Sequence, residues 1–391
     1  MMKKIAIALV ALLVGLAASA QDRQTIKITH GPWLCDMTED AVTVVWTTDQ
    51  PAMSWVEYGE DLGDHFYSEE RPRVYDAKHG RRLAHKTVHT VRLTGLKPGT
   101  KYQYRIFSQH TVDWSFSDYV KLGEVAASVV YKHEPFRFTT FSPDDKEVTF
   151  FVVNDVHGRK DDLKALCKDV DFSKYDFVLL NGDMLSSLEN EQQMFDGWLD
   201  ACVEMFASNT PIQFARGNHE NRGKFADHLF EYFPTHTGNF YYTFNVGKTG
   251  FIVCDPGEDK PDSDIEYGGI AEFDPYREIE AAWIREAAKN LEGSQKIAIC
   301  HVPPTTRVWH GDNELQRLFF PALTGNGIDL MLSGHLHEYN FVPANAQHDF
   351  PILVNDNKSY LSVTVKDGKI VTDIISSDPK ASKSHTFRTK K

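Results

Sequence analysis

The chain has 391 residues, which is long for one hydrophobic core and favours two domains. Its hydrophobic content of 41% and charged content of 25% are those of an ordinary globular protein. The formal net charge of -13 argues against a broad nucleic-acid-binding surface.

Residues 1–20 have the pattern of a secretory signal peptide. Two lysines near the start precede an apolar run from Ile5 to Leu16, and Ala18-Ser19-Ala20 is a small-residue cleavage site. The apolar run is too short to span a membrane, and no later run reaches spanning length. We therefore expect a secreted or periplasmic protein without a membrane span in the mature chain. Its five cysteines show no Cys-x-x-Cys pairing, which argues against a dense disulfide framework, although one pair could be bridged.

Residues 22–142 are predicted to be all-β. Short alternating runs such as Ala41–Trp46 and Thr87–Leu93 are separated by turns, as in a β-sandwich. The stretch VRLTGLKPGTKYQYRI, residues 91–106, resembles fibronectin type III domains at the turn that enters the sixth strand. The resemblance implies that the Tyr102 hydroxyl folds back onto this turn, whereas a generic hairpin would leave it exposed. We expect a structural or docking unit here and assign it no chemistry.

A second domain is predicted for residues 147–376, after a polar boundary at residues 141–146. The runs VTFFVV, FVLLN, PIQFA, GFIVC, KIAIC and DLMLS are short and apolar, as buried strands are. Helical patterns lie between most of them, over about residues 160–170, 191–206, 225–233, 276–291 and 313–323. This alternation predicts an α/β fold, and residues 377–391 are expected to form a loose polar tail.

Most of these predicted strands end in a block of polar residues. In an open α/β sheet, ligands bind beyond the carboxyl ends of the strands, so the blocks should meet at one edge. Seven side chains with carboxylate, imidazole or amide groups are candidate metal ligands: Asp155, His157, Asp183, Asn218, His301, His335 and His337. This set suits two divalent cations, which about 3.5–4 Å apart can clamp a phosphoryl group and activate a water.

Strand alternation is expected to turn Asp155 and His157 toward the same ion, and to turn His219 away from Asn218. His219 is then free to act as a general acid. Asp255 also ends a strand, but Pro256-Gly257 follows, so we interpret it as a turn residue. Four further residues could meet a phosphate, but a solvated loop or an ordinary salt bridge is favoured for each: Arg216, Arg307, Trp309 and His310.

The ordered set Asp-x-His, Gly-Asp, Gly-Asn-His-Glu, His and Gly-His-x-His resembles the calcineurin-like metallophosphoesterase superfamily over about residues 147–375. With a β-sandwich in front, it resembles the purple acid phosphatase arrangement. The resemblance implies a sandwich of mixed β-sheets flanked by helices. It places one metal on Asp155, His157, Asp183 and His337. It places the second metal on Asp183, Asn218, His301 and His335, and leaves iron, manganese or zinc open.

Two departures from these relatives stand out. Purple acid phosphatases have a metal-binding tyrosine three residues after the Gly-Asp aspartate, whereas this chain has Ser186, and they lack a histidine equivalent to His157. We therefore expect a colourless protein. The Ser/Thr phosphatases carry a supporting aspartate in this region, but Ser186 and Ser187 stand there, so the partner of His219 stays open.

The resemblance implies a dinuclear-metal phosphoesterase acting on a small-molecule phosphate ester. A metal-bound hydroxide would attack phosphorus in line, and His219 would assist the leaving oxygen. Monoester and diester substrates are both open, and the sequence does not specify an oligomeric state. The alternative is a non-catalytic module whose β-sandwich binds a glycan or a protein and whose metal site is structural.

Overall fold

The computed structural model describes residues 25–115, 119–128, 134–305 and 308–389. The predicted signal peptide and Arg307 lie outside these ranges. Within them, no helix is long and apolar enough to cross a membrane. All five cysteines are buried free thiols, so the pair that the sequence left open is not bridged.

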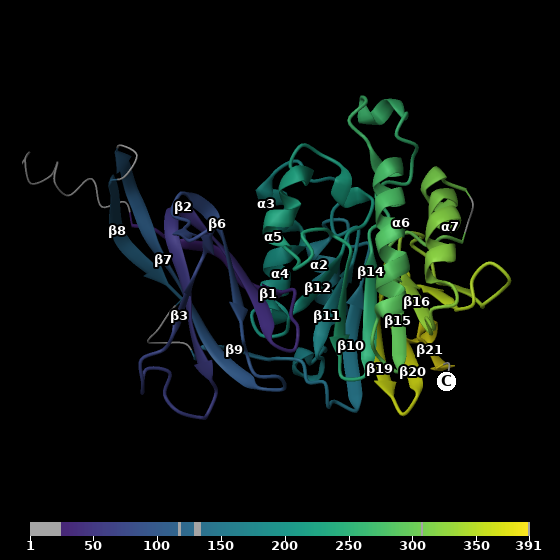
Figure 1. Ribbon diagram of the computed structural model, residues 1–391, viewed down its shortest axis with the longest axis horizontal. Coiled ribbons are helices and arrows are strands. Elements are labelled where there is room, and N and C mark those ends of the chain that lie inside the picture. The colour runs from purple at the N-terminus through teal and green to yellow at the C-terminus, as the bar shows by residue number, and fades with distance from the viewer. Residues whose placement is uncertain (1–24, 116–118, 129–133, 306–307, 390–391) are drawn as a thin grey trace, which may run out of the picture.

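The N-terminal region is all-β, as predicted, and lies beside the helical part of the molecule (Figure 1). Its strands are β1 (Ile28–Cys35), β2 (Ala41–Glu60), β3 (Arg73–Tyr75), β4 (Ala77–Lys78), β5 (Arg81–Arg82), β6 (Lys86–Thr94), β7 (Lys101–Ser115), β8 (Tyr119–Ala127) and β9 (Phe136–Thr139). The run predicted at Ala41–Trp46 is the first part of β2, a strand of 20 residues. The first half of β2 pairs with β1 and β6, and its second half pairs with β3 and β7.

The Tyr102 hydroxyl folds back onto the preceding turn, as the sequence predicted. The Lys97 backbone N–H donates a 2.9 Å hydrogen bond to this hydroxyl. Tyr102 itself is buried and stacks against Phe138 of β9. The bond therefore fixes the turn before β7 to the core of the β-sandwich.

The N-terminal region is joined to the following domain by sheet pairing and by buried contacts. Strand β1 pairs in parallel with β12 (Ile212–Ala215), so a 13-stranded sheet runs through both parts of the chain. The Trp33 indole donates a hydrogen bond of 2.9 Å to the Tyr232 carbonyl, and the Tyr104 hydroxyl donates one of 2.7 Å to the Ser208 carbonyl. The two parts thus share a continuous hydrophobic core.

The second domain has two facing sheets between two layers of helices. Its strands are β10 (Glu147–Val153), β11 (Phe177–Asn181), β12, β13 (Tyr242–Val246), β14 (Thr249–Cys254), β15 (Gln295–Cys300), β16 (Leu330–Ser333), β17 (Asn340–Val342), β18 (Ile352–Val354), β19 (Ser359–Lys366), β20 (Lys369–Ser376) and β21 (Lys383–Arg388). The first sheet contains the order β21-β20-β19-β10-β11-β12, and the second has the order β13-β14-β15-β16-β18-β17. Both mix parallel and antiparallel pairs, as predicted.

The helices and short helical turns cover the outer faces of these sheets (Figure 1). They are α2 (Lys160–Cys167), η1 (Phe172–Lys174), α3 (Glu191–Met194), η2 (Phe195–Leu199), α4 (Asp200–Cys202), η3 (Val203–Ala207), η4 (His219–Asn221), η5 (Ala226–His228), α5 (Leu229–Tyr232), η6 (Ile265–Tyr267), α6 (Phe273–Asn290), α7 (His310–Leu323) and η7 (Pro379–Ala381). The helix expected over residues 191–206 is present, but two of its four segments, η2 and η3, have π-helical geometry.

Strand alternation explains why these layers form. In β10, Phe150 and Val152 face the opposite sheet, whereas Phe151 and Val153 face the helices from α2 to α5. Strands β14 to β16 divide their side chains in the same way between the other sheet and helices α6 and α7. Since both faces of each sheet are covered, the strands contain continuous apolar runs.

The expectation of a loose C-terminal tail is wrong. Strand β21 pairs with β20 along six residues and forms the last strand of the 13-stranded sheet. His385 of this strand lies 2.6 Å from the Tyr339 hydroxyl, and Phe387 contacts Phe341. The polar residues of the segment reflect an exposed edge strand, where charged side chains are common, rather than missing structure.

Candidate metal centre

The structure brings all seven candidate ligands and His219 to one edge of the two sheets. This edge lies at the carboxyl ends of β10, β11 and β12 from one sheet and of β15 and β16 from the other. The loops also bind one another. The Asp155 N–H donates to the Gly182 carbonyl at 3.0 Å, and the Gly334 N–H donates to the His301 carbonyl at 2.9 Å. Short loops on buried strands therefore hold the eight side chains together.

The orientation of the candidate ligands is set by local backbone conformation rather than by strand alternation. Five of the eight described non-glycine residues with positive φ are candidate ligands: Asp155, His157, Asp183, His335 and His337. This conformation is strained for residues with a Cβ atom and persists where the surroundings enforce it, most often at functional sites. The prediction that Asp155 and His157 share one side is confirmed, but the expected cause, continuation of the β-strand, is wrong.

Close approach between the loops requires glycine at two positions. A Cβ atom on Gly182 would lie 2.6 Å from the His301 ring, and this residue has a φ of 78°. A Cβ atom on Gly334 would lie 2.8 Å from Oδ2 of Asp155. The glycines of the two sequence blocks thus leave room for ligands that come from other strands.

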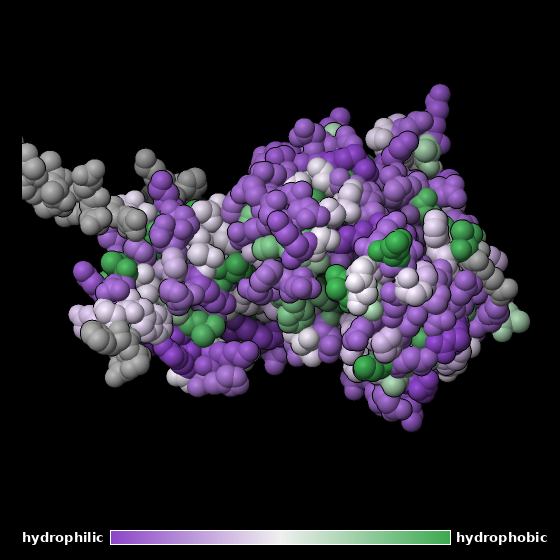
Figure 2. Space-filling model, turned by 90° about the horizontal axis from the view of Figure 1, so that it is seen from above, coloured by the Kyte–Doolittle hydropathy of each residue, from purple (hydrophilic) through white to green (hydrophobic). Residues whose placement is uncertain are grey.

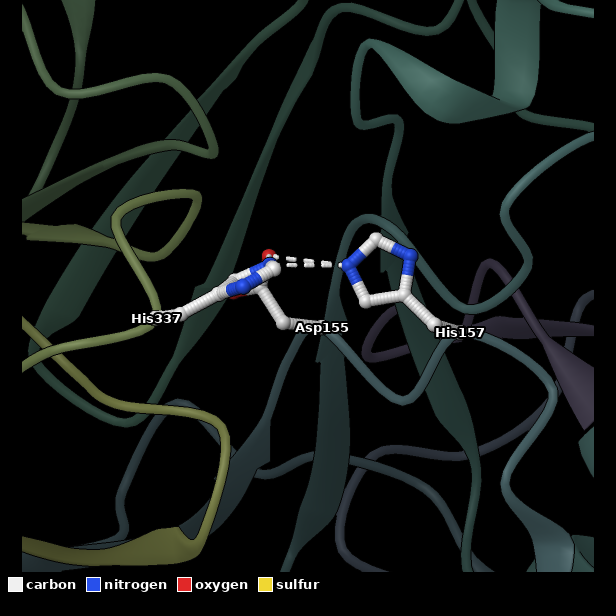
Figure 3. A group of neighbouring side chains, drawn as sticks. All are labelled: Asp155, His157 and His337. Atoms are coloured by element: carbon white, nitrogen blue, oxygen red, sulfur yellow. Dashed lines mark hydrogen bonds and ion pairs between the residues drawn. The ribbon is translucent and has the colours of Figure 1, made fainter.

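Asp155, His157 and His337 form the outer cluster of the site. The two imidazoles point toward one another from opposite sides, with the Asp155 carboxylate between them (Figure 3). Their Nε2 atoms are 2.9 Å apart, and Asp155 Oδ1 lies 3.2 Å from His337 Nε2 and 3.7 Å from His157 Nε2. The His337 side chain is 47% exposed, so this cluster opens to solvent.

Asp183, Asn218, His301 and His335 form the inner cluster. Nε2 of His301 lies 3.0 Å from Oδ2 of Asp183, and Nδ1 of His335 lies 3.0 Å from the Asn218 side-chain oxygen. Nδ1 of His301 lies 2.6 Å from the Asn181 carbonyl, so this bond sets the tautomer and leaves Nε2 facing the carboxylates. Asp183, Asn218 and His301 are almost completely buried.

The donor atoms of both clusters fit bound cations. Asp155 Oδ1 and His301 Nε2 are buried without a well-aligned hydrogen bond, although Asp183 Oδ2 is near the latter. The Asn218 oxygen faces acceptor atoms on Asp183 and His335, which a cation between them would satisfy. Oxygen and imidazole donors at this spacing are the ligands that zinc, manganese and iron bind.

The electrostatics of the site also favour cations. Burial raises the pKa of Asp155 and of Asp183, but the neighbouring groups together outweigh it, with His301 making the largest contribution, so both carboxyl pKa values lie below the usual range. Burial alone would lower the pKa of His301, but the opposite effect of Asp183 and Asp155 is larger and raises it to about 10. Without metal, a proton on His301 thus offsets part of the charge of the two carboxylates. A divalent cation would supply twice that positive charge at the same place.

Ser186 contacts both His157 and His219. Nδ1 of His219 lies 2.7 Å from the Ser186 carbonyl, which accepts its proton. The Ser186 hydroxyl lies 3.3 Å from Nδ1 of His157. The partner of His219, which the sequence left open, is therefore a backbone carbonyl, and no side-chain signal could have revealed it. Both imidazoles consequently turn Nε2 toward the centre of the site.

Glu220 shapes the loops beneath the ligands. One of its oxygens accepts hydrogen bonds from the Asp183 and Gly217 N–H groups, both at 2.8 Å, and the other accepts one from Met184 N–H at 2.7 Å. Burial raises the pKa of Glu220 to about 7. This residue belongs to the Gly-Asn-His-Glu block, so the motif contains it, although no role could be assigned to it from the sequence.

Arg222 was not predicted from the sequence. Its guanidinium lies 3.2 Å from Nε2 of His219 and is held by Glu258 at 2.7 and 2.9 Å and by Asp259 at 3.1 Å. Burial lowers the pKa of His219, and Arg222 lowers it further against the opposing effect of Asp183. Arg222 therefore connects Glu258 and Asp259, in the acidic loop after β14, with His219.

The structure adds to the interpretation of Asp255 as a turn residue, because its side chain accepts a hydrogen bond from the Gly257 N–H at 3.2 Å and has further partners. It is fully buried and accepts hydrogen bonds from Arg216, at 2.6 and 3.0 Å, and from the Tyr276 hydroxyl at 2.7 Å. Asp255 thus anchors loops beside the site, and the salt bridge favoured for Arg216 is confirmed. His310 forms another salt bridge, at 2.9 Å from Asp274, and Trp309 is 44% exposed at the start of α7.

Comparisons with known proteins find two matching domain models. Residues 148–339 match the model of the calcineurin-like phosphoesterases, and residues 33–121 match the purple acid phosphatase N-terminal domain. The chain carries a calcineurin-like phosphoesterase domain behind a purple acid phosphatase N-terminal domain. The clustered carboxylate and imidazole side chains, which could hold metal ions, all lie within the part of the chain that matches the calcineurin-like phosphoesterases.

Individual relatives agree with these domains. The chain is 23% identical over 330 residues to purple acid phosphatase 21 of Arabidopsis thaliana, which covers 77% of this chain. It is 25% identical over 215 residues to acid phosphatase type 7 of Mus musculus, which covers 54% of this chain and 44% of that protein. The chain spans 63% of the length of the first of these relatives.

Two solved structures show the same fold. The purple acid phosphatase PPD1 from yellow lupin (Lupinus luteus) seeds superposes with a TM-score of 0.62 at 15% identity, over 91% of this chain and 73% of that one. A structure of PhoD superposes with a TM-score of 0.57 at 13% identity, over 91% and 88% of the two chains. At these identities, the likeness concerns the fold alone.

Proposed function

We propose that this protein hydrolyses small phosphate esters with the help of two divalent metal ions. The proposal rests on one observation: the outer and inner clusters lie side by side. Nε2 of His301 lies near both Asp183, at 3.0 Å, and Asp155 of the outer cluster, at 3.9 Å. Asp155, His157, Asp183 and His337 would hold one ion. Asp183, Asn218, His301 and His335 would hold the other. When bound, the ions would neutralise charge on the phosphoryl group and make a water nucleophilic.

His219 is proposed as the group that gives a proton to the leaving oxygen. Its Nδ1 proton is held by the Ser186 carbonyl, so Nε2 is the atom that takes up and donates the catalytic proton. The His219 backbone N–H also donates to Asp183 Oδ1 at 2.9 Å, which ties its position to the metal edge. Arg222, held by two carboxylates, limits the movement of the imidazole.

Secretion or export to the periplasm is also part of the proposal, and it rests on the sequence of residues 1–20. Expression of the full chain in a secreting host tests it, followed by mass spectrometry of the released protein. We expect an N-terminus at Gln21. Retention of residues 1–20 on a protein that stays inside the cell would contradict this part alone.

The activity is tested with mono- and bis-(nitrophenyl) phosphate after chelation and re-addition of manganese, zinc or iron. We expect metal-dependent hydrolysis that Asp183→Ala and His219→Ala both abolish, and the ratio of the two rates identifies a monoesterase or a diesterase. Two bound ions without hydrolysis of either ester would contradict a general phosphoesterase. Such a result would favour the binding module that the sequence also allowed.

A further inference from the structure

A long stretch of the N-terminal β-sandwich contains no acidic residue. Residues 77–112 include eight lysines and arginines but no aspartate or glutamate, in a chain whose net charge is -13. The eight cations are Lys78, Arg81, Arg82, Lys86, Arg92, Lys97, Lys101 and Arg105. Such segregation of charge creates a local positive potential, which attracts anions even to a protein that is acidic overall.

Several of these cations already have acidic partners. Lys86 pairs with Asp76 at 2.9 Å, and Arg92 pairs with Asp36 at 2.5 Å. Lys97 and Lys101 also form salt bridges, with Glu60 and Asp61. Within this stretch, Lys78, Arg81 and Arg82 have no carboxylate within 4 Å among the residues that the structure describes. These three come from one small hairpin.

The hairpin of β4 and β5 places its arginines against aromatic rings. Residues His79 and Gly80 both have positive φ, which suits a two-residue turn between paired strands. The Arg81 guanidinium carbon lies 4.9 Å from the centre of the Trp114 ring, and that of Arg82 lies 3.5 Å from the centre of the Tyr75 ring. The aromatic faces hold the guanidinium groups in place without neutralising their charge.

A cavity of about 420 Å³ opens between this hairpin and the end of β7. This volume lies within the range of roughly 300–1,000 Å³ that small-ligand sites have. Its wall combines the guanidinium groups of Arg81 and Arg82 with Leu83, Ala84, His85, Lys86 and the Trp114 ring. The His85 ring stands perpendicular to Trp114, at 5.9 Å between centroids. An aromatic ring therefore lies beside two guanidinium groups that have no carboxylate partner.

We propose that this cavity, the Arg81–Trp114 pocket, binds an acidic carbohydrate, whose sugar ring packs on Trp114 while its carboxylate or sulfate groups meet Arg81 and Arg82. The single aromatic wall and the spaced cations suit a chain with separated charges. A nucleic acid strand would need a longer positive groove to follow its closely spaced phosphates, and the net charge of -13 opposes such a groove. The pocket would localise the protein independently of the metal centre.

The test measures binding to four hexamers by isothermal titration calorimetry: a uronate oligosaccharide, a sulfated oligosaccharide, a neutral glucan and single-stranded oligothymidylate. The full chain, the double variant Arg81→Ala/Arg82→Ala, and Trp114→Leu are compared. Arg285→Ala, an exposed arginine on α6 with no acidic partner among the described residues, is the matched control. Circular dichroism and hydrolysis of nitrophenyl phosphate show whether each variant is folded.

We expect an acidic oligosaccharide to bind and the neutral glucan not to bind. The double variant should lose at least tenfold in affinity, Trp114→Leu several-fold, and Arg285→Ala less than twofold, with hydrolysis unchanged in all. Binding should weaken as salt rises. Equal affinity of the double variant and the full chain, or no binding of either acidic hexamer, would overturn the proposal. Tighter binding of oligothymidylate through the same arginines would assign the pocket to nucleic acid instead.

Discussion

The metal edge and the N-terminal β-sandwich both bury polar side chains, but they satisfy them differently. In the sandwich, the Trp46 indole donates to the Ser108 hydroxyl, which also bonds Ser54. At the metal edge, Asp155 Oδ1 and His301 Nε2 are buried without a well-aligned hydrogen bond. A polar group left unpaired inside a protein costs free energy unless a ligand completes it. His89 Nδ1 of the sandwich is also buried without a partner, but it stands alone, whereas the two atoms at the metal edge lie 3.9 Å from one another. The difference between the regions is therefore the clustering of unpaired polar atoms at the metal edge.

The hydrophobic surface of the molecule is consistent with this division. Seen from above in Figure 2, hydrophobic atoms are scattered singly among hydrophilic ones instead of forming one large patch. Isolated exposed apolar residues are normal on a soluble surface. On this face, no large apolar patch marks a docking surface.

The largest effect is expected for Asp183→Asn. Asp183 follows β11 and is the one residue proposed to hold both ions, so loss of its charge should release metal and lower the rate constant of hydrolysis by at least roughly 10³-fold. Asp176→Asn is the matched control, because Asp176 precedes the same strand at its other end. Steady-state kinetics of both variants measure the rate constant of hydrolysis, and metal analysis measures the metal bound per chain. Equal losses in the two variants would contradict a role specific to the metal edge.

Trp33→Ala should lower the stability of the protein without changing the rate constant of hydrolysis. Trp33 of β1 is fully buried against Phe195, Tyr232 and Phe233 of the phosphoesterase domain. Its loss should lower the free energy of unfolding by about 4 kcal/mol, measured by urea denaturation. The metal ligands remain, so the folded fraction should keep its rate constant of hydrolysis at low temperature. A variant of normal stability would show that the shared core does not join the domains.

Acid should weaken the β-sandwich through His89. Burial lowers the pKa of His89 to about 3, with Lys86 adding to the effect, and Thr48 lies 2.8 Å from its Nε2. The unfolded chain binds a proton near pH 6.5, whereas the folded chain does not until about pH 3. The stability that neutral His89 permits is therefore lost as pH falls between these values.

The expected loss is about 3 kcal/mol between pH 7 and pH 4.5 for a group shifted this far. His89→Gln cannot take up this proton, so its unfolding free energy should depend less steeply on pH. Urea denaturation at several pH values measures both slopes. Parallel slopes for the two proteins would show that His89 does not govern the acid sensitivity.

The smallest effect is expected for Ser186→Ala. This change removes the hydroxyl beside His157 but keeps the carbonyl that holds His219. Metal affinity should fall by roughly tenfold, as is usual when a partner of a ligand is lost, while the pH profile of hydrolysis keeps its shape. Ser187→Ala is the matched control. A changed pH profile at unchanged metal affinity would place the effect on His219 instead.

The sequence predicted the gathering of the ligands because each stands directly after a buried strand, as Asp183 does after β11. It could not predict how they are aimed, since the positive φ values of Asp155 and His157 depend on bonds between loops far apart in the chain. The Ser186 carbonyl and Arg222 were missed for a related reason. A backbone acceptor leaves no residue signature, and a salt-bridged arginine has no fixed spacing from the motif.

Fold prediction failed where local composition opposed tertiary pairing. The polar segment of β21 resembles a loose tail, but the free edge of β20 and the rings of Tyr339 and Phe341 give it a place in the sheet. Strand β2 continues through Pro51 because its partners change there, from β6 to β7. The low β-strand propensity of one residue, such as Pro51, is a weak signal where the rest of the strand pairs with neighbouring strands.

The central claim is that two cations bound at the metal edge are needed for hydrolysis. It is tested most directly by adding metal in steps to the chelated protein while the rate of nitrophenyl phosphate hydrolysis is recorded. The rate should rise until two equivalents per chain are bound and then remain constant. A plateau at one equivalent, or no hydrolysis with two ions bound, would contradict the account.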